Sequence, residues 1–206
     1  MNILIKKFRI KSFKEEKPII DLKDLSIHYG NRQIVEGLNL SIQKSEICGL
    51  LGPNGAGKSS IYHCIIGLVK PSYGKIFING IDVTDIPTHK RCSKFGISWV
   101  PQYGGSWADL TVFENLLAIA ELHIKNKEQR VTKINNLIRK FELQNVIKLK
   151  SKYLSGGQVR KLTLAMAMVK DTKILILDEP FAALDPQSVR MIQQIIVSLQ
   201  MFERIS

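Results

Sequence analysis

The stretch Ile47–Ser60 reads ICGLLGPNGAGKSS and contains a complete G-x-x-x-x-G-K-[ST] pattern from Gly52 to Ser59. An apolar run, Ile47–Leu51, comes directly before the pattern, and a helical periodicity that ends near Leu68 follows it. This order of strand, loop and helix is typical of a phosphate-binding loop. Its glycines leave the backbone N–H groups open to a phosphate, because no Cβ stands in the way. The residues predicted to line this nucleotide site are Gly52, Pro53, Asn54, Gly55, Ala56, Gly57, Lys58, Ser59 and Ser60.

Two side chains of this pattern carry specific expectations. Lys58 can reach the β- and γ-phosphates of a nucleotide, and the Ser59 hydroxyl is placed to ligate Mg²⁺. The helix that follows presents the positive end of its dipole to the same anion. A chance glycine-rich turn would not combine strand, lysine and serine in this register, so the stretch predicts a site for a nucleoside triphosphate and Mg²⁺.

The overall composition is that of an ordinary globular chain. Of its 206 residues, 45% are apolar and 23% are charged. Its longest apolar runs are far shorter than the ~18 residues needed to cross a bilayer, and basic residues interrupt the N-terminus too early for a signal peptide. Three cysteines without a C-x-x-C spacing predict reduced thiols rather than disulfides or a zinc site. We therefore expect a cytoplasmic protein.

Two segments supply much of the net charge of +12. Residues 1–18 hold six Lys/Arg against two Glu, and residues 121–152 hold nine against three acids. Neither segment carries a nucleic-acid-binding motif or interleaved aromatic residues. A solvated lysine-rich face is the preferred interpretation, with no nucleic-acid partner and at most a weak attraction to anionic membranes.

Apolar periodicity predicts the order of helices and strands. Alternating residues indicate a hairpin joined by the Gly30-Asn31 turn, and helical spacing dominates between about residues 103 and 170. Thr111 and Ser155 are of the types that cap helices through their side chains. The predicted elements are strands at 19–29, 32–42, 75–79, 96–100 and 174–177, a turn at 71–74, and helices at 59–68, 111–123, 128–141, 155–169 and 186–199.

The apolar run Ile174–Leu177 stops at two acids, Asp178 and Glu179. Such a run is typical of a strand buried on both faces of a parallel sheet, and ligands of open α/β sheets bind beyond the carboxyl ends of these strands. Asp178 is suited to hold Mg²⁺, directly or through water. Glu179 is suited to polarise a water for attack on a γ-phosphate. Taken with the phosphate loop, the two acids predict a nucleotide-hydrolysing α/β protein.

In this order the motifs resemble those of the ATP-binding subunits of ABC transporters. The resemblance covers residues 19–200 and includes Tyr29, the phosphate loop, Gln102 after a strand, the sequence LSGGQ at Leu154–Gln158 and the sequence LDEP at 177–180. LSGGQ between a phosphate loop and an LDEP strand is highly specific to this family. This LSGGQ sequence, called the signature below, also has a physical reason. A serine cap followed by two glycines makes a helix end that is open to anions.

The resemblance implies a fold and a domain organisation. The fold is an α/β P-loop NTPase core of mixed and parallel sheet, with an N-terminal antiparallel β subdomain and an inserted α-helical subdomain at about residues 103–170. Residues 1–18 are then a basic N-terminal extension, and residues 19–206 are the ATP-binding domain. The helix predicted at 186–199 should lead to a further strand and a switch histidine, and Met201–Ser206 are too few to supply them.

The resemblance also implies roles for single residues. Tyr29 stacks on adenine, Glu179 is the catalytic base, and Gln102 senses the attacking water and Mg²⁺. The Mg²⁺ ligands are Ser59, Gln102 and Asp178. Two chains pair as a homodimer and sandwich ATP, with the second chain contributing Ser155, Gly156, Gly157, Gln158 and Asp185. Transmembrane transporter subunits are the further partners, which places the chain on the cytoplasmic face of the inner membrane.

Within the family, the segment 85–102 resembles most the LptB-type ATPases of lipopolysaccharide export, whose membrane partners are LptF- and LptG-like. Branched-chain amino-acid importers share much of this segment and remain an alternative. Ala108-Asp109, after Trp107, departs from the basic residues often found in the LptB type. A truncated ATP-binding protein with weak or no hydrolysis is another alternative. A family member without membrane partners would predict tandem signatures or a long coiled-coil insertion, which this chain lacks.

Overall fold

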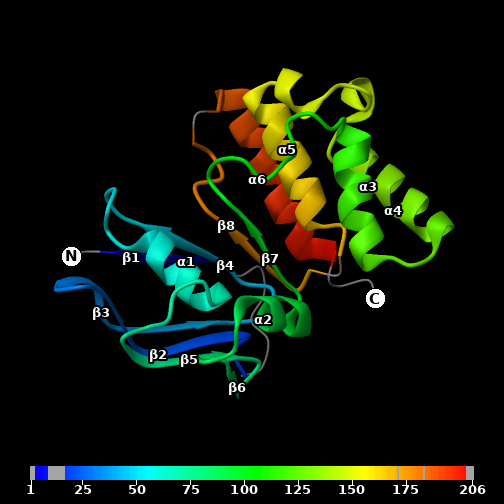
Figure 1. Ribbon diagram of the computed structural model, residues 1–206. Coiled ribbons are helices and arrows are strands. Elements are labelled where there is room, and N and C mark those ends of the chain that lie inside the picture. Colours follow the sequence, from blue (N-terminus) through cyan, green and yellow to red (C-terminus); the bar gives the residue numbers. More distant parts are fainter. Residues whose placement is uncertain (1–2, 9–16, 171, 183, 203–206) are drawn as a thin grey trace. The chain divides into compact units, whose positions relative to one another are not determined.

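The computed structural model describes residues 3–8, 17–170, 172–182 and 184–202, and the chain forms two compact units (Figure 1). The first unit comprises the described residues up to Phe95 together with 200–202, and the second comprises Gly96–Leu199. The elements of the first unit are β1 (Leu4–Phe8), β2 (Ile20–Tyr29), β3 (Arg32–Ile42), β4 (Ile47–Leu51), α1 (Lys58–Ile66), β5 (Tyr73–Ile78), β6 (Ile81–Asp82) and α2 (Thr88–Phe95). Those that begin in the second are β7 (Ile97–Val100), α3 (Val112–His123), α4 (Lys127–Lys140), η1 (Gln144–Val146), η2 (Ser151–Tyr153), α5 (Gly156–Ala167), β8 (Ile174–Leu177) and α6 (Pro186–Phe202).

Four strands of the first unit form an antiparallel sheet in the order β3-β2-β5-β6. The predicted hairpin is confirmed, because β2 and β3 pair antiparallel and Tyr29 lies opposite Arg32 across the two-residue turn. Gly30 takes a φ of 57° in this turn, which a residue without a Cβ adopts at little cost. The buried side chains of the sheet are apolar and include Leu22, Leu25, Ile27, Ile76 and Ile78.

Gly74 corrects one prediction, because it lies inside β5 rather than in a turn at 71–74. It faces an irregularity of β2 between Lys23 and Ser26, where Asp24 has a φ of 50°. A Cβ on Gly74 would lie 2.3 Å from the carbonyl oxygen of Asp24, and its own φ is 85°. Only glycine therefore lets the two strands approach here. Glycine is a common turn residue, but at this position it allows close pairing of two strands at a β-bulge.

Strand β1 falls in the predicted basic extension, for which the sequence indicated no secondary structure. It pairs antiparallel with β4, the strand that leads into the phosphate loop, from Leu4 opposite Leu51 to Phe8 opposite Ile47. The Lys7 amine also donates to the backbone carbonyl of Ser41. Residues 9–16 of the extension lie outside the described residues.

Helix α1 ends at Ile66, two residues earlier than predicted, because Gly67 takes a left-handed φ of 84° and closes it. The N–H groups of Gly67 and Leu68 both donate to the carbonyl of His63, which is the usual way to satisfy the end of a helix. Further carbonyls at this end accept hydrogen bonds from Arg91, a fully buried residue of α2. Arg91 therefore connects α2 to the end of the phosphate-loop helix.

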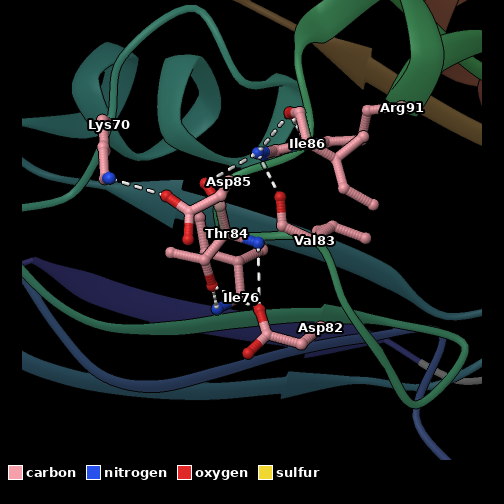
Figure 2. A network of polar contacts seen from close by, with 8 residues as sticks. All are labelled: Lys70, Ile76, Asp82, Val83, Thr84, Asp85, Ile86 and Arg91. Carbon is pink, nitrogen blue, oxygen red and sulfur yellow. Dashed lines mark hydrogen bonds and ion pairs between the residues drawn. The ribbon is translucent and has the colours of Figure 1, made fainter.

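The segment between β6 and α2 is organised by Thr84 and Asp82 (Figure 2). Thr84 donates to Asp82 Oδ1 through both its hydroxyl, at 2.6 Å, and its backbone N–H, at 3.0 Å. The same hydroxyl accepts from the backbone N–H of Ile76 in β5. These hydrogen bonds, with a smaller contribution from Lys75, lower the pKa of Asp82 to about 2, because they favour its charged form.

Thr84→Val is expected to raise the pKa of Asp82 toward its ordinary range, since it removes the hydroxyl donor. The pKa of Asp82 is lower in the folded chain than in the unfolded chain. Its carboxylate therefore stabilises the fold above the unfolded pKa, and this contribution is lost as the pH falls toward 2. A pH titration of the Asp82 carboxyl carbon by NMR measures this change. An unchanged pKa in the variant would show that the backbone N–H and Lys75 account for the depression.

The strand predicted at Ile174–Leu177 lies in a parallel pair, as expected, and its partner is β7. β7 and β8 run parallel in register, from Ile97 opposite Ile174 to Val100 opposite Leu177. The carboxyl ends of the two strands therefore lie at the same edge. This edge matters for the candidate site, because Gln102 follows β7 and Asp178-Glu179 follow β8.

The other elements of the second unit are helices, and α3 packs on both α4 and α5 (Figure 1). The predicted caps at Thr111 and Ser155 are present, and each forms a reciprocal capping box with the residue three positions later. α4 begins at Lys127, one residue before the predicted start, and the side chain of Asn126 caps it. Helical periodicity predicts that Val131 faces the core, whereas it is 39% exposed. The buried core includes Leu116, Ile134, Ile138, Phe141, Leu162, Leu164 and Ile192.

Two expectations from composition can be checked on the structure. Cys48, Cys64 and Cys92 are all described and form no disulfide, as predicted, and burial raises the pKa of Cys64 to about 11. Among the described residues, no helix is both long enough and apolar enough to cross a membrane.

Candidate functional site

The phosphate loop connects β4 to α1 within the first unit. Its Lys58 is the first residue of α1, and the side-chain amine turns back to donate to the carbonyls of Gly52, at 2.8 Å, and Pro53, at 2.9 Å. The backbone N–H of Ala56 donates to the carbonyl of Pro53 as well. These hydrogen bonds close the loop on itself, and they hold the Lys58 amine against the carbonyls at its start.

The start of α1 differs from the starts of the capped helices in the second unit. Gly57 occupies the N-cap position with a φ of 93°, no side chain caps the helix by a hydrogen bond, and its first turn carries no acid. The first N–H groups of an α-helix have no acceptor within the helix, so this end favours an anion. A Cβ on Gly57 would lie 2.9 Å from side-chain carbons of Ile34 and Val35, whereas one on Gly55 would meet nothing within 4 Å. Gly57 thus allows close packing on β3, and Gly55 leaves open space.

The other predicted nucleotide residues of the first unit lie where the pattern placed them. Ser59 and Ser60 are the second and third residues of α1, and Asn54 is in the loop. Tyr29 is the last residue of β2 and is 48% exposed, so its ring is accessible to a base. The hydroxyl and ring roles of these residues remain predictions.

The two predicted catalytic side chains meet in the second unit. Gln102 Nε2 donates to Glu179 Oε2 at 2.5 Å, although 77 residues separate them in the sequence. The parallel register of β7 and β8 explains the contact, because both residues lie just beyond the carboxyl ends of paired strands. Gln102 Nε2 also donates to the hydroxyl of Tyr103, at 3.3 Å. An amide held beside a carboxylate is an arrangement suited to orienting and polarising a water.

Asp178, the predicted Mg²⁺ ligand that precedes Glu179, is 8% exposed. Its backbone N–H donates to the carbonyl of Val100 at 3.0 Å and continues the pairing of β7 with β8 by one residue. A carboxylate at a strand end is the ligand type that Mg²⁺ prefers. Glu179 takes a left-handed φ of 44°, so the backbone turns sharply between the two acids.

The signature sequence forms the start of α5. Ser155 Oγ accepts from the N–H of Gln158, and Gln158 Oε1 accepts from the N–H of Ser155 at 2.9 Å. The next two residues are Gly156 and Gly157, which place no side chains over the first turn. A Cβ on Gly157 would lie 2.4 Å from Ser188 Oγ, so this glycine allows the starts of α5 and α6 to pack together.

Asp185, predicted to help join two subunits, caps α6. Its carboxylate accepts from the hydroxyl of Ser188 at 2.6 Å and from the N–H groups of Gln187 and Ser188. The hydroxyl of Ser188 is the main cause that lowers the pKa of Asp185, followed by the backbone N–H groups. The Asp185-Pro186 order is a helix-start signal, because proline is favoured at the first helical position. The subunit role of Asp185 remains a prediction.

Two residues of this region received no role from the sequence. Asn115 is fully buried in α3 and organises the segment after Gln102: its side chain accepts from the N–H of Trp107 and donates to the carbonyls of Trp107, Leu110 and Thr111. Arg160 is buried in α5 and contacts the backbone beside both Gln102 and Glu179. A polar residue within an apolar helical face is a weak signal for such a role, and arginines are usually solvated.

Comparison with known proteins identifies the class to which this fold and these motifs belong. The family model of ABC transporters matches residues 35–182, and the chain therefore belongs to the ATP-binding proteins of ABC transporters. It is 38% identical over 183 residues to the lipopolysaccharide export system ATP-binding protein LptB of Haemophilus influenzae, a match that covers 88% of this chain and 76% of that protein.

Other relatives show that this similarity is not confined to one transport system. The chain is 40% identical over 174 residues to an uncharacterized ABC transporter ATP-binding protein of Rhizobium meliloti, covering 84% of this chain. It is 38% identical over 180 residues to the Nod factor export ATP-binding protein I of the same species, covering 87% of this chain. The chain spans 64% of the length of the first of these two proteins and 53% of the second.

Solved structures confirm the predicted fold class. The ATP-binding cassette MJ1267 of an ABC transporter has a TM-score of 0.80 at 23% identity, over 90% of this chain and 78% of that one. CbiO1 of Clostridium perfringens, part of the ABC transporter complex cbiONQ, has a TM-score of 0.79 at 25% identity, over 90% and 75%. The fold is that of an ABC ATPase domain.

Proposed function

We propose that this chain binds and hydrolyses MgATP as the ATP-binding subunit of an ABC transporter that exports lipopolysaccharide. The observation that carries the proposal is the hydrogen bond between Gln102 and Glu179, in a chain that belongs to this family. It brings an amide and a carboxylate together beyond the ends of two parallel strands, and these are the two side chains expected to handle the attacking water.

The remaining site residues have complementary tasks in this proposal. The loop amides and Lys58 bind the β- and γ-phosphates, and Tyr29 stacks on the base. Ser59, Gln102 and Asp178 would hold Mg²⁺, which neutralises charge on the phosphates when bound. Glu179 accepts a proton from the attacking water, while Gln102 fixes the direction of that water.

The signature helix supports a dimer with two sandwiched ATP molecules. The start of α5 offers N–H groups at Gly156 and Gly157 with no side chain in front of them, and Ser155 fixes the first turn through its capping box. The start of α1 already offers an anion site within the same chain. A second such end is explained if it serves a nucleotide bound to a second copy of the chain.

Lipopolysaccharide export is favoured by the LptB relatives and by the 85–102 segment, and its partners would be LptF- and LptG-like membrane subunits. Asp109, where the LptB type often has basic residues, forms an ion pair with Lys152 at 2.6 Å. The hydrogen bond from Lys152 lowers the pKa of Asp109 and keeps it charged. This pairing reduces the acidic character of the segment that follows Trp107, which would face the membrane subunits in this proposal. Co-purification with the membrane subunits encoded in the same genome tests the assignment, and capture by importer subunits instead would favour the branched-chain amino-acid alternative.

Lys58→Ala is expected to weaken MgATP binding at least about tenfold, because it removes the cation nearest the predicted phosphates. Isothermal titration of the purified chain measures the affinity. Lys70→Ala is the matched control, since Lys70 is an exposed lysine of the same unit that pairs only with Asp85 among the ion pairs described. Equal affinities for both variants and the unchanged chain would contradict a phosphate role for Lys58.

A further inference from the structure

One buried guanidinium in the second unit, that of Arg160, contacts the backbone on both sides of the Gln102–Glu179 pair. The residue is 7% exposed and lies in α5. One of its acceptors directly precedes Gln102, and the other three bracket Glu179. The acceptors are the carbonyl oxygens of Pro101, Asp178, Glu179 and Pro180, at 2.7, 2.9, 3.0 and 3.2 Å.

The contact needs the shape of arginine. A guanidinium presents five N–H donors in one plane and can serve several carbonyls at once, whereas a lysine amine is a compact group with three donors. Hydrogen bonds from a charged donor are stronger than those between neutral groups. Leaving a buried carbonyl without its donor lowers stability by more than the net contribution of the hydrogen bond itself. The two segments are thus held to one another by a single side chain.

The backbone of Glu179 gives this contact a specific purpose. Its φ of 44° is a left-handed conformation that a glutamate rarely adopts, and such conformations persist only where the surroundings hold them. Arg160 Nη2 binds the carbonyl of Glu179 itself, and Nε binds that of the next residue. Arg160 therefore holds the backbone turn from which the Glu179 side chain extends, while Gln102 binds the carboxylate itself.

The same helix carries the signature at its start. Arg160 lies five residues after Ser155, within the first turns of α5. A helix moves as a rigid element over so short a distance, because its backbone hydrogen bonds fix each residue to the next turn. Any displacement of Gly156 and Gly157 by a nucleotide would therefore reach the carbonyls that Arg160 holds.

We propose that Arg160 is a positioning residue for ATP hydrolysis: through four backbone carbonyls it fixes the Gln102–Glu179 pair and makes that pair follow the signature helix. The inference rests on the proposed function, because it assigns a task within that reaction. Arg160 touches no reacting atom. It acts on turnover through the geometry of two other residues.

The test compares Arg160→Met with Lys161→Met. Lys161 is the next residue of α5, is 8% exposed and binds Glu142 Oε2 at 3.0 Å, so its replacement removes a buried cation of the same helix away from Gln102 and Glu179. Arg160→Met is expected to lower kcat for ATP at least about tenfold while KM and ATP affinity change less than about twofold. Lys161→Met should leave kcat within about twofold. Arg160→Lys keeps the charge and should recover part of kcat.

Hydrogen exchange of backbone amides supplies a readout that does not need turnover. In Arg160→Met, amides in 102–103 and 179–182 that the structure describes should exchange at least about tenfold faster, and in Lys161→Met they should not. Unchanged exchange, or equal losses of kcat in the two Met variants, would overturn the proposal. So would a loss of ATP affinity that accounts for the loss of rate.

The same experiments separate this inference from the proposed function. An unchanged chain that binds ATP but has no turnover would contradict the proposed hydrolysis, and the exchange comparison would still decide whether Arg160 holds the two segments. If Arg160→Met does not yield folded protein, Arg160→Lys decides: exchange and kcat equal to those of the unchanged chain would refute a need for the planar guanidinium.

Discussion

Glu179→Gln is expected to lower ATP turnover by about 10²- to 10⁴-fold while ATP affinity stays within about threefold, the range of effect of a positioned general base. Glutamine keeps the size of the side chain and can still accept a hydrogen bond from Gln102, but it cannot take a proton from water. The free chain and the ATP-bound state would therefore keep their geometry, and only the chemical step would slow. Phosphate release at saturating MgATP measures the effect.

Glu142→Gln is a matched control for this variant. Glu142 is also a glutamate with a left-handed φ, of 54°, and its carboxylate likewise binds one side-chain partner, Lys161. The chemical change is the same and both residues have a left-handed backbone, but Glu142 follows α4 and is no part of the candidate site. Turnover of Glu142→Gln should equal that of the unchanged chain. Unchanged hydrolysis in Glu179→Gln would remove Glu179 from the role of base.

The same variant tests the proposed dimer. If two chains close over two ATP molecules and hydrolysis opens them, a chain that binds ATP without hydrolysing it should accumulate as a dimer. Size-exclusion chromatography of Glu179→Gln with and without MgATP measures this. A monomer in both conditions, with ATP bound, would contradict the sandwich while leaving the role of Glu179 intact.

The parts of the fold that the sequence predicts best are those with local causes. The hairpin at Gly30-Asn31, the caps at Thr111 and Ser155 and the strand at Ile174–Leu177 each follow from a few neighbouring residues, and the structure confirms them. Side-chain caps and two-residue turns act over three or four positions, so their signal does not depend on the rest of the chain.

Features with distant causes were missed. Strand β1 is stabilised by pairing with β4, and its own sequence, LIKKF, does not alternate. The sequence predicts a turn at Gly74, whereas the need for glycine there comes from the backbone of Asp24, some fifty residues away in the chain. Helix α2 was not predicted either, although Pro87 directly before it is a start signal.

The candidate site divides in the same way. The phosphate loop and the signature are continuous in sequence, so every residue of each could be named in advance. The contact of Gln102 with Glu179 depends on the register of two strands, and only the family resemblance pointed to it. Arg160 and Arg91 could not be found, because nothing in a sequence distinguishes a buried arginine that serves carbonyls from a solvated one.

Arg91→Leu is expected to lower the free energy of unfolding by about 3–5 kcal/mol, since several buried carbonyls lose a charged donor and each costs on the order of 1–3 kcal/mol when left unsatisfied. Arg91 is 2% exposed and is therefore removed from water. Its Nη1 donates to the carbonyls of Cys64 and Ile65 at 2.6 and 2.8 Å. Its Nε and Nη2 serve the carbonyls of Val83, Thr84 and Ile86, part of which Figure 2 shows.

The site of Arg91 leaves little room for relaxation. A Cβ on Gly67 would lie 2.9 Å from the guanidinium carbon, so the end of α1 and the guanidinium are in close contact. Leucine would fill part of the space but offers no donor to the carbonyls of Cys64 and Ile65. Because these carbonyls end the helix that begins at Lys58, we expect the phosphate loop to lose order as well. Urea denaturation followed by circular dichroism measures the loss of stability.

Lys94→Leu separates the loss of these hydrogen bonds from the loss of a charge, because Lys94 is an exposed cation of the same helix α2. It should change the free energy of unfolding by less than about 0.5 kcal/mol, as most surface substitutions do. Arg91→Lys should fall between the two, since an amine can serve some of the five carbonyls but not all. If Arg91→Leu lowered the free energy of unfolding no more than Lys94→Leu does, water or a shift of the backbone would have to satisfy the carbonyls at the end of α1. The fold of this unit would then not depend on the guanidinium.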